Sequence, residues 1–209
     1  MKIIDLDSWP RRSQFEFFRG IRNPHFSLTV DVEVTRLVED LKPKGVSVFN
    51  AALFAIMAAA NAVPELRTRF RGDRVVEHEV VHASVTVPIE DDRFAFCDIE
   101  FSPGWPDFDA RCRKVVADAK RQTELRDKVA HLDDWIYLSC LPWIHFTSMT
   151  NPMNGPDDCT PRITWGRFDR RDGAWRMPVA IEAHHALVDG QHAGRFYAEL
   201  EQRLSDGFA

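Results

Sequence analysis

Two adjacent histidines followed by an aspartate and a glycine form the part of this chain best suited to chemistry. His184, His185, Asp189 and Gly190 follow the spacing H-H-x-x-x-D-G. An imidazole has an ordinary pKa near ~6.5, so its neutral form can take a proton from an alcohol at cellular pH. Asp-Gly is also a common turn pair, and a doubled histidine at a strand end is more often structural than catalytic. Residue types alone leave both a general base and a structural turn open.

A metal site is an alternative use of this segment. Four side chains in it are potential ligands: His184, His185, Asp189 and His192. No zinc-like Cys or His spacing recurs elsewhere, and the four cysteines stand singly at positions 97, 112, 140 and 159. We therefore expect no metal. Unpatterned cysteines in a chain of this length are typical of free thiols in a reducing compartment.

The elements around the histidines place them where a strand gives way to a helix. Residues 176–184 have the apolar content and alternation of a strand. Residues 190–204 have the pattern of an amphipathic helix with Phe196, Leu200 and Leu204 inside. Because loops at strand ends are favoured places for catalysis, the segment between these elements is the expected site.

Four further helices are predicted. Residues 13–19 form a short helix, and Thr35 caps a second one that ends at about Leu41, near a proline. Ser47 opens a very apolar helix over residues 48–63, whose alanines suggest close packing beneath a sheet. Residues 106–129 form a charged amphipathic helix whose inner face consists of Phe108, Cys112, Val115, Val116, Ala119 and Leu125.

The remaining segments read as strands. Alternation over residues 26–34 predicts a half-buried strand, and short runs between 66 and 99 predict hairpins. Further strands are expected over residues 135–141 and 163–168, and a turn at 170–173 leads into the strand that carries His184. Helices against a mixed, mostly antiparallel sheet predict a two-layer α/β sandwich of the α+β class. We expect residues 1–209 to form one domain.

Composition narrows the class of protein. The chain has 209 residues, is 44% hydrophobic and carries a net charge of −5, so it can bury a sizeable core. Its acidic balance argues against a role on nucleic acids or membrane surfaces. The amino terminus has no apolar signal core, and no run approaches the ~20 apolar residues of a membrane helix. A cytoplasmic enzyme is the expected class.

Three blocks of sequence together resemble the chloramphenicol acetyltransferases. These are Trp-Pro-Arg-Arg-Ser-Gln-Phe-Glu-Phe-Phe-Arg at 9–19, Ser-Cys-Leu-Pro-Trp-Ile-His-Phe-Thr-Ser at 139–148, and the histidine segment at 184–196. They occur in the family's order and spacing, and the resemblance covers almost the whole chain. It implies the family's fold and O-acetylation of chloramphenicol, which gives resistance to the antibiotic. It also implies acetyl-CoA as cosubstrate, with no tightly bound cofactor.

The resemblance assigns the chemistry to two side chains. His185 matches the general base, which deprotonates the acceptor hydroxyl directly in a ternary complex, with its other ring nitrogen held by a backbone carbonyl. His184 would then point to the opposite side as a buried, satisfied histidine. Ser139 matches a serine whose hydroxyl donates to the tetrahedral oxyanion.

Four other residues match supporting positions. Asp189 would pair with Arg11 and hold the active-site loop, a contact that can be bidentate. Gly190 would supply backbone freedom where the chain enters the last helix. Trp143 matches a tryptophan near the pantetheine arm of coenzyme A.

The acceptor pocket is where this chain departs from the family. The resemblance places the acceptor against Phe17, Phe18, Arg22, Phe94, Asn151 and Thr164. Phe18 stands where a tyrosine is usual, while Arg22 and Asn151 stand for apolar residues and Tyr137 for a residue that is often asparagine. These changes make the pocket more polar or charged, and a buried unpaired charge discriminates strongly between ligands. Chloramphenicol is therefore one candidate acceptor, and a different alcohol or amine is another.

Two further expectations follow from the resemblance. A non-catalytic scaffold, as in dihydrolipoyl acyltransferase cores with the same H-x-x-x-D-G motif, is a third hypothesis, which the 9–19 block counts against. The active protein is expected to be a homotrimer, in which the base of one subunit faces an acceptor pocket built largely by the next.

Overall fold

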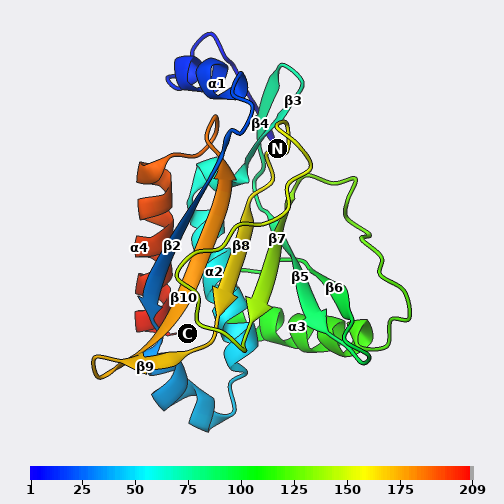
Figure 1. Ribbon diagram of the computed structural model, residues 1–209, viewed down its shortest axis with the longest axis vertical. Helices are drawn as coiled ribbons and strands as arrows, with labels where there is room; N and C mark the ends of the chain where they lie inside the picture. The colour runs from blue at the N-terminus through cyan, green and yellow to red at the C-terminus, as the bar shows by residue number, and fades with distance from the viewer. Residues whose placement is uncertain (208–209) are drawn as a thin grey trace.

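The computed structural model describes residues 1–207 and is dominated by one mixed sheet of seven strands (Figure 1). The strands run in the order β2-β10-β8-β7-β5-β6, with β9 attached to β10. Their bounds are β2 (His25–Glu33), β5 (His82–Pro88), β6 (Phe94–Ile99), β7 (Trp135–Leu141), β8 (Arg162–Gly166), β9 (Asp169–Arg171) and β10 (Ala174–His184). The β5–β7 and β7–β8 pairs are parallel and the other pairs are antiparallel. The predicted mixed, mostly antiparallel sheet is confirmed.

Three helices cover one face of this sheet: α2 (Val48–Ala62), α3 (Trp105–Ala119) and α4 (Gly190–Asp206). The predicted two-layer arrangement is therefore correct. Ser47 caps α2 by accepting a hydrogen bond from the Asn50 N–H, and α2 is buried continuously from Asn50 to Ala60. Its alanines let the helix lie close to the sheet, as expected. Within residues 1–207, no helix combines the length and apolar character needed to cross a membrane.

The amino-terminal part of the chain forms a cap at one end of the large sheet. Helix α1 (Arg12–Arg19) lies beside a small sheet of β1 (Lys2–Ile4), β4 (Arg74–Glu77) and β3 (Thr68–Arg71). The ring of Phe15 meets that of Phe70 edge-on, and Arg19 pairs with Asp73 at 3.0 Å. These contacts fix α1, and the 9–19 block with it, near the end of β10.

The opposite face of the sheet is covered by a long connection rather than by helices. Residues 142–161 cross in front of the sheet in Figure 1. The Ser27 hydroxyl donates to the Met149 carbonyl at 2.6 Å, and the Asn151 N–H donates to the Glu182 carboxylate at 2.5 Å. This connection therefore encloses polar side chains that point away from the helices.

Two helix predictions are wrong in detail. Helix α3 ends at Ala119 instead of continuing to residue 129, and Leu125 is exposed rather than inside. Beyond the helix, Asp127 accepts a hydrogen bond from the Val129 N–H, a local side-chain bond that competes with helix formation. Thr35 does not cap the next helical segment, the π-helical turn η1 (Leu37–Leu41), because its hydroxyl accepts from the Trp175 N–H of β10.

Strand β8 ends at Gly166, before the predicted end at residue 168. A Cβ at Gly166 would lie 2.7 Å from Pro178 Cγ and 2.8 Å from the Ile144 carbonyl oxygen, so only glycine fits there. The next N–H, that of Arg167, donates to the Ile144 carbonyl and leads the chain out of the sheet. This close approach sets the wall of a cavity described below.

Candidate active site

His185 lies in the turn that joins β10 to α4, immediately after the last residue of the strand. Its backbone N–H donates to the Pro24 carbonyl at 2.8 Å. Its ring stacks on Phe18 with the centroids 3.8 Å apart and the planes 2° from parallel, and Phe26 lies 4.9 Å away. Two aromatic rings and a backbone bond therefore fix the orientation of this imidazole.

The expected backbone partner of the His185 ring is missing. Nδ1 is buried and has no hydrogen-bond partner among the described residues. The carbonyl oxygen of the preceding His184 is used by the turn itself, where it accepts from the N–H groups of Leu187 and Val188 at 3.0 Å each. Ring stacking, rather than a carbonyl, holds the imidazole in this chain.

His184 differs from His185 in its burial and in the hydrogen bonds of its ring. It is 1% exposed, its Nε2 lies 2.9 Å from the Pro156 carbonyl, and its Nδ1 accepts from the Ala186 N–H at 3.1 Å. Burial lowers the pKa of His184 to about 4, although the hydrogen bond to Pro156 opposes this shift. With both nitrogens satisfied, His184 is the buried structural histidine that the sequence predicts.

Asp189 holds the other end of the turn. One carboxylate oxygen lies 2.5 Å from Arg11 Nη1, so the expected contact is present through a single atom pair. The other oxygen accepts from the N–H groups of Gln191 and His192 and caps α4. Burial is the largest single influence and acts to raise the pKa of Asp189, but the Arg11 hydrogen bond, the nearby charges of His192 and Arg11 and the Gln191 N–H together outweigh it, so the pKa is lowered overall. Gly190 adopts no left-handed φ and has open space around it, so its expected special backbone role is not needed here.

Ser139 lies in β7, in a row of hydroxyl side chains. It is aligned with Thr86 of β5 and Thr164 of β8, and the Thr86 hydroxyl donates to Ser139 Oγ at 3.3 Å. Ser139 lines a cavity of about 390 Å³ together with Phe94 and Trp143. The structure thus brings Ser139 together with Trp143 and with one of the predicted acceptor residues, Phe94.

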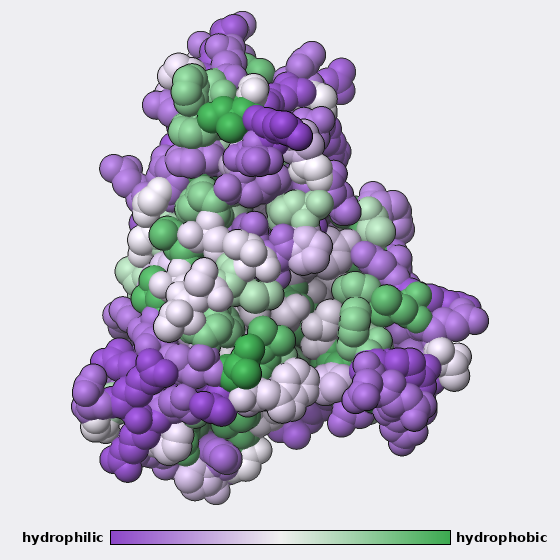
Figure 2. Space-filling model, in the orientation of Figure 1, coloured by the Kyte–Doolittle hydropathy of each residue, from purple (hydrophilic) through white to green (hydrophobic). Residues whose placement is uncertain are grey.

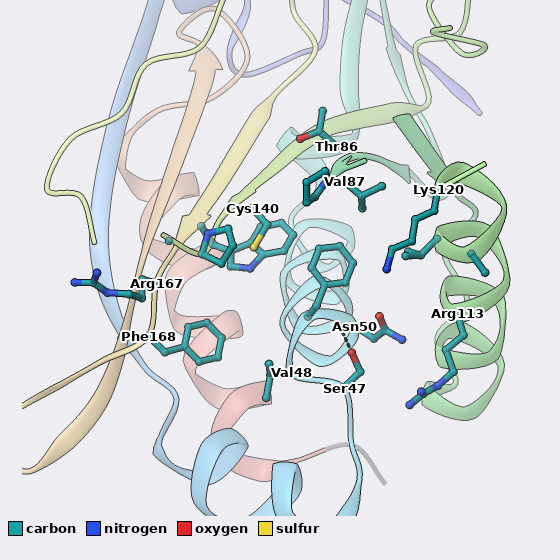
Figure 3. A pocket seen from close by; sticks show the side chains of 17 residues that line it. Ser47, Val48, Asn50, Thr86, Val87, Arg113, Lys120, Cys140, Arg167 and Phe168 are labelled. Carbon is teal, nitrogen blue, oxygen red and sulfur yellow. Dashed lines mark hydrogen bonds between the residues drawn. The ribbon is translucent and has the colours of Figure 1, made fainter. Parts of the chain in front are cut away.

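A second cavity, of about 660 Å³, adjoins the first and is drawn in Figure 3. It opens between α2, α3 and the carboxyl ends of β7 and β8, and both cavities share Thr86, Val87, Pro88 and Cys140. Arg113 and Lys120 extend from α3 on one side, and Arg167 lies on the other (Figure 3).

These three cations were not among the predicted site residues. Arg113 and Lys120 belong to the charged side of the predicted helix over residues 106–129, and Arg167 to the predicted strand over 163–168. A signal was available in the spacing of the α3 residues that line the cavity. Arg113, Val116, Ala117 and Lys120 recur at helical intervals, so they share one face.

Two of the predicted acceptor residues are buried in a polar network instead of lining a cavity. The Thr164 hydroxyl, fully buried, donates to the Asn151 side-chain oxygen at 3.2 Å. Asn151 in turn donates to Glu182 from its backbone N–H and from its side chain, at 2.5 and 3.3 Å. Glu182 is a buried carboxylate that the sequence analysis did not single out, although a charged residue within the apolar strand was a visible signal.

Phe18 packs on the His185 ring, whereas two further predicted acceptor residues lie at the surface of this chain. Phe17 is 67% exposed and Arg22 is exposed in the segment that precedes Pro24. Tyr137 turns its hydroxyl to Asp127 at 2.8 Å, and the Arg162 guanidinium lies 4.6 Å from its ring centroid. Among residues 1–207, no group of three or more His, Cys, Asp or Glu side chains is arranged to hold a metal ion.

His185 and Ser139 are far apart within one chain. Ser139 is aligned with Thr164, which is aligned with Ala180 of β10. His185 follows Ala180 by five residues, so it lies roughly 16 Å further along the sheet, and β7 is roughly 10 Å from β10 across it. A single chain does not bring the imidazole to the serine.

Comparison with known proteins agrees with this architecture. The sequence model of the chloramphenicol acetyltransferase family matches residues 1–201. A chloramphenicol acetyltransferase of Streptomyces acrimycini is 31% identical over 207 residues, which cover 97% of this chain and 94% of that protein. Chloramphenicol acetyltransferase 3 of Escherichia coli is 28% identical, with 95% and 94% covered.

Solved structures extend the likeness to three dimensions. A chloramphenicol acetyltransferase structure superposes with a TM-score of 0.88 at 29% identity, covering 96% of this chain and 98% of the other. A probable dihydrolipoamide acetyltransferase from Listeria monocytogenes shares the fold alone, at 15% identity and a TM-score of 0.66. The sheet and helices are those of an acyl-CoA-dependent transferase. The chain belongs to the chloramphenicol acetyltransferase family, which confirms the resemblance drawn from the three sequence blocks.

Proposed function

We propose that this protein transfers the acetyl group of acetyl-CoA to a hydroxyl of chloramphenicol, directly and within a ternary complex. The observation that carries the proposal is the His185 imidazole, which two aromatic rings hold in a turn fixed by Arg11 and Asp189, in a chain of this family. The relatives at 25–31% identity are named chloramphenicol acetyltransferases.

In this mechanism His185 is the general base and Ser139 stabilises the oxyanion. The imidazole takes the proton of the acceptor hydroxyl as its oxygen attacks the thioester carbon. With Thr86 as its donor, the Ser139 hydroxyl keeps its own hydrogen for the developing negative charge. Collapse of the tetrahedral intermediate expels the coenzyme A thiolate, which takes the proton from the His185 imidazolium and restores the neutral base. The acetyl group passes directly to the acceptor oxygen, so no acyl-enzyme forms.

We assign acetyl-CoA to the two adjoining cavities, which share four lining residues. We place the thioester in the smaller cavity beside Ser139 and Trp143. The larger cavity continues from it across four shared residues and carries Arg113, Lys120 and Arg167. Guanidinium and ammonium groups are the usual partners of phosphate oxygens. Arg113 already pairs with Asp109 and Arg167 with Asp169, so Lys120 is the side chain that we expect to receive a phosphate of the coenzyme.

The distance between His185 and Ser139 supports a site shared between subunits. In a cyclic trimer, His185 of one subunit would face Ser139 of the next, and three equivalent sites would close the ring. Figure 2 shows apolar surface exposed in several places on the viewed face of the molecule. Phe17, Phe94 and Trp143, at 67, 45 and 63% exposed, are large apolar side chains of the kind an interface covers.

Subunit mixing tests the shared site. Light scattering should give about three times the 24.1 kDa chain mass. After subunit exchange, a mixture of the His185→Ala and Ser139→Ala proteins should be well above either protein alone in activity, because some hybrid interfaces contain both wild-type side chains. A fully active monomer, or no recovery despite proven exchange, would contradict this arrangement.

A second acceptor class is favoured by one observation. The polar wall expected to hold the acceptor already bonds to itself through Thr164, Asn151 and the buried carboxylate of Glu182. An acceptor molecule placed against these residues would need hydrogen-bond donors for the oxygen atoms of Asn151 and Glu182. A different alcohol or an amine is therefore the alternative to chloramphenicol.

Assays of thiol release from acetyl-CoA with chloramphenicol and a panel of alcohols and amines decide between these acceptors. The His185→Ala protein is the blank for thioester hydrolysis. Transfer to no member of the panel would refute the proposed function and favour the non-catalytic scaffold. The predicted cytoplasmic location remains a prediction.

A further inference from the structure

His192 is the one histidine of the His184–His192 segment that the proposed mechanism leaves without a task. It lies in the first turn of α4 and is 5% exposed. Its Nδ1 accepts a hydrogen bond from the Asp189 N–H at 3.0 Å, while the Asp189 carboxylate accepts from the His192 N–H at 3.4 Å. Its Nε2 lies 3.3 Å from Glu65 Oε1, in the 3-10 helix η3 (Pro64–Arg67) that follows α2.

These contacts define the proton positions on the ring. The hydrogen of a backbone amide is fixed in the peptide plane, so the Asp189 N–H pointing at Nδ1 requires a lone pair there. The ring proton then sits on Nε2 and faces the Glu65 carboxylate. The same Glu65 oxygen receives Arg195 Nη2 at 3.0 Å, which orients the carboxylate from the opposite side.

An imidazolium is the competing state, because Nδ1 also lies 3.3 Å from the Asp189 carboxylate. A proton on Nδ1 would collide with the Asp189 amide hydrogen and break the reciprocal cap. The charged groups that face the ring are Glu65 and Asp189, which favour the cation, and Arg11 and Arg195, which disfavour it. Burial is the largest influence and lowers the pKa of His192, in keeping with the neutral ring.

We propose that neutral His192, locked in the Nε2–H form by Glu65, is a positioning residue for the His185 base. Asp189 is held at its carboxylate by Arg11 and at its backbone N–H by His192, so both sides of the residue that ends the catalytic turn are fixed. His192 does not touch the reacting atoms. This assignment rests on the proposed role of His185 as the base. His192 secures the position of His185 through its hydrogen bond to the Asp189 N–H.

The first test separates positioning from mere support of the fold. His192→Phe keeps a ring of similar size without an acceptor, whereas His192→Asn keeps an acceptor oxygen close to the Nδ1 position. We expect His192→Phe to lower kcat by about 10²-fold with KM for both substrates within about twofold, since a misplacement of 1 Å can cost that much. His192→Asn should recover kcat to within about fivefold of wild type, with a melting temperature matched to that of His192→Phe. Equal kcat values for the two variants, or a His192→Phe enzyme as active as wild type, would overturn the assignment.

The second test needs no acetyl transfer. Long-range ¹H–¹⁵N spectra of the full-length protein with labelled histidine report which ring nitrogen carries the proton, and the His192→Asn spectrum identifies the His192 signals. The Nε2–H form is expected at neutral pH. In the Glu65→Ala protein this form should no longer be the exclusive one, because the carboxylate that faces Nε2 is gone. An Nδ1–H form or an imidazolium at neutral pH would disprove the inference even if the enzyme acetylates chloramphenicol. Absence of transfer to every acceptor would instead refute the proposed function while the spectra still decide the state of His192.

Discussion

The two regions proposed to form one active site differ in how completely a single chain builds them. The His185 turn is fully formed within one chain. The rings of Phe18 and Phe26 pack against the imidazole, Arg11 pairs with Asp189, and both ring nitrogens of His184 are hydrogen-bonded. The Ser139 region is open, with two cavities and the exposed rings of Phe94 and Trp143. The proposed base is thus preorganised within its own chain. The Ser139 region, by contrast, would be completed only by a bound substrate or a neighbouring subunit.

The largest expected effect on kcat is that of a substitution in the His185 turn. His185→Ala should reduce kcat by ~10³-fold or more, because a general base contributes 10²–10⁴-fold and no other free imidazole lies beside it. Circular dichroism and the melting temperature should change little. His184→Ala is the matched control: it deletes two buried hydrogen bonds and should lower the melting temperature more than His185→Ala does. Retention of more than about a tenth of turnover by His185→Ala would exclude His185 as the base.

In the Ser139 region we expect a smaller loss of kcat. Ser139→Ala should lower kcat by ~10²-fold, the usual cost of one oxyanion donor, and leave KM for acetyl-CoA nearly unchanged. Thr86→Val removes the hydroxyl that donates to Ser139 and leaves the serine hydrogen in place, so its effect on kcat should be several-fold smaller. Steady-state kinetics with both substrates varied would show this. A raised KM with unchanged kcat would make Ser139 a binding residue instead.

The Arg11–Asp189 contact should show coupled effects on stability and activity. Asp189→Asn keeps an acceptor to cap α4 but removes the charge, and Arg11→Gln removes the partner. The two changes together should cost less than their sum, with a coupling free energy of about 1 kcal/mol from urea unfolding. Strict additivity would show that the two side chains do not interact.

The same contact should make stability depend on pH. Because the pKa of Asp189 is lowered on folding, its contribution is complete above the ordinary carboxyl pKa. It should be lost as the pH falls through the lowered value. In the Asp189→Asn protein this part of the unfolding profile should be absent.

The smallest effect should come from the rim of the larger cavity. Lys120→Ala should raise KM for acetyl-CoA about three- to tenfold at low salt with kcat unchanged, because it removes one cation from the proposed phosphate site. Lys114→Ala, on the same helix but outside the cavity lining, is the control and should leave KM unchanged. Equal effects of the two substitutions would place the phosphates elsewhere.

The parts of the site that the sequence could predict are local along the chain. The His185-to-Gly190 spacing, the cap at Ser47 and the alternation of β2 each lie within one element, so pattern alone identified them. The Arg11–Asp189 contact joins residues 178 apart, and only the resemblance to a family suggested it.

The parts that escaped prediction depend on neighbours distant in sequence. Thr164 meets Asn151 and Glu182 because a connection folds over the open face of the sheet, and no local pattern encodes that fold. The Thr35 hydroxyl accepts from the Trp175 N–H of β10. Helix α3 ends at Ala119, and Gln122 just beyond it donates its side-chain amide to the Phe96 carbonyl of β6. Arg113 and Lys120 were visible as one helical face, but only the sheet beside them turns that face into a cavity wall.

The order of strands has a consequence for how this protein is made. Strand β2 occupies one edge of the sheet and pairs with β10, which is synthesised after every other strand of that sheet. Until then β2 has an unpaired edge, a known template for aggregation, and its native pairing requires closure of a very long loop. The histidine turn follows β10 directly. A nascent chain therefore carries its arginine block before it gains the proposed base, the carboxylate and the partner strand, which are synthesised together.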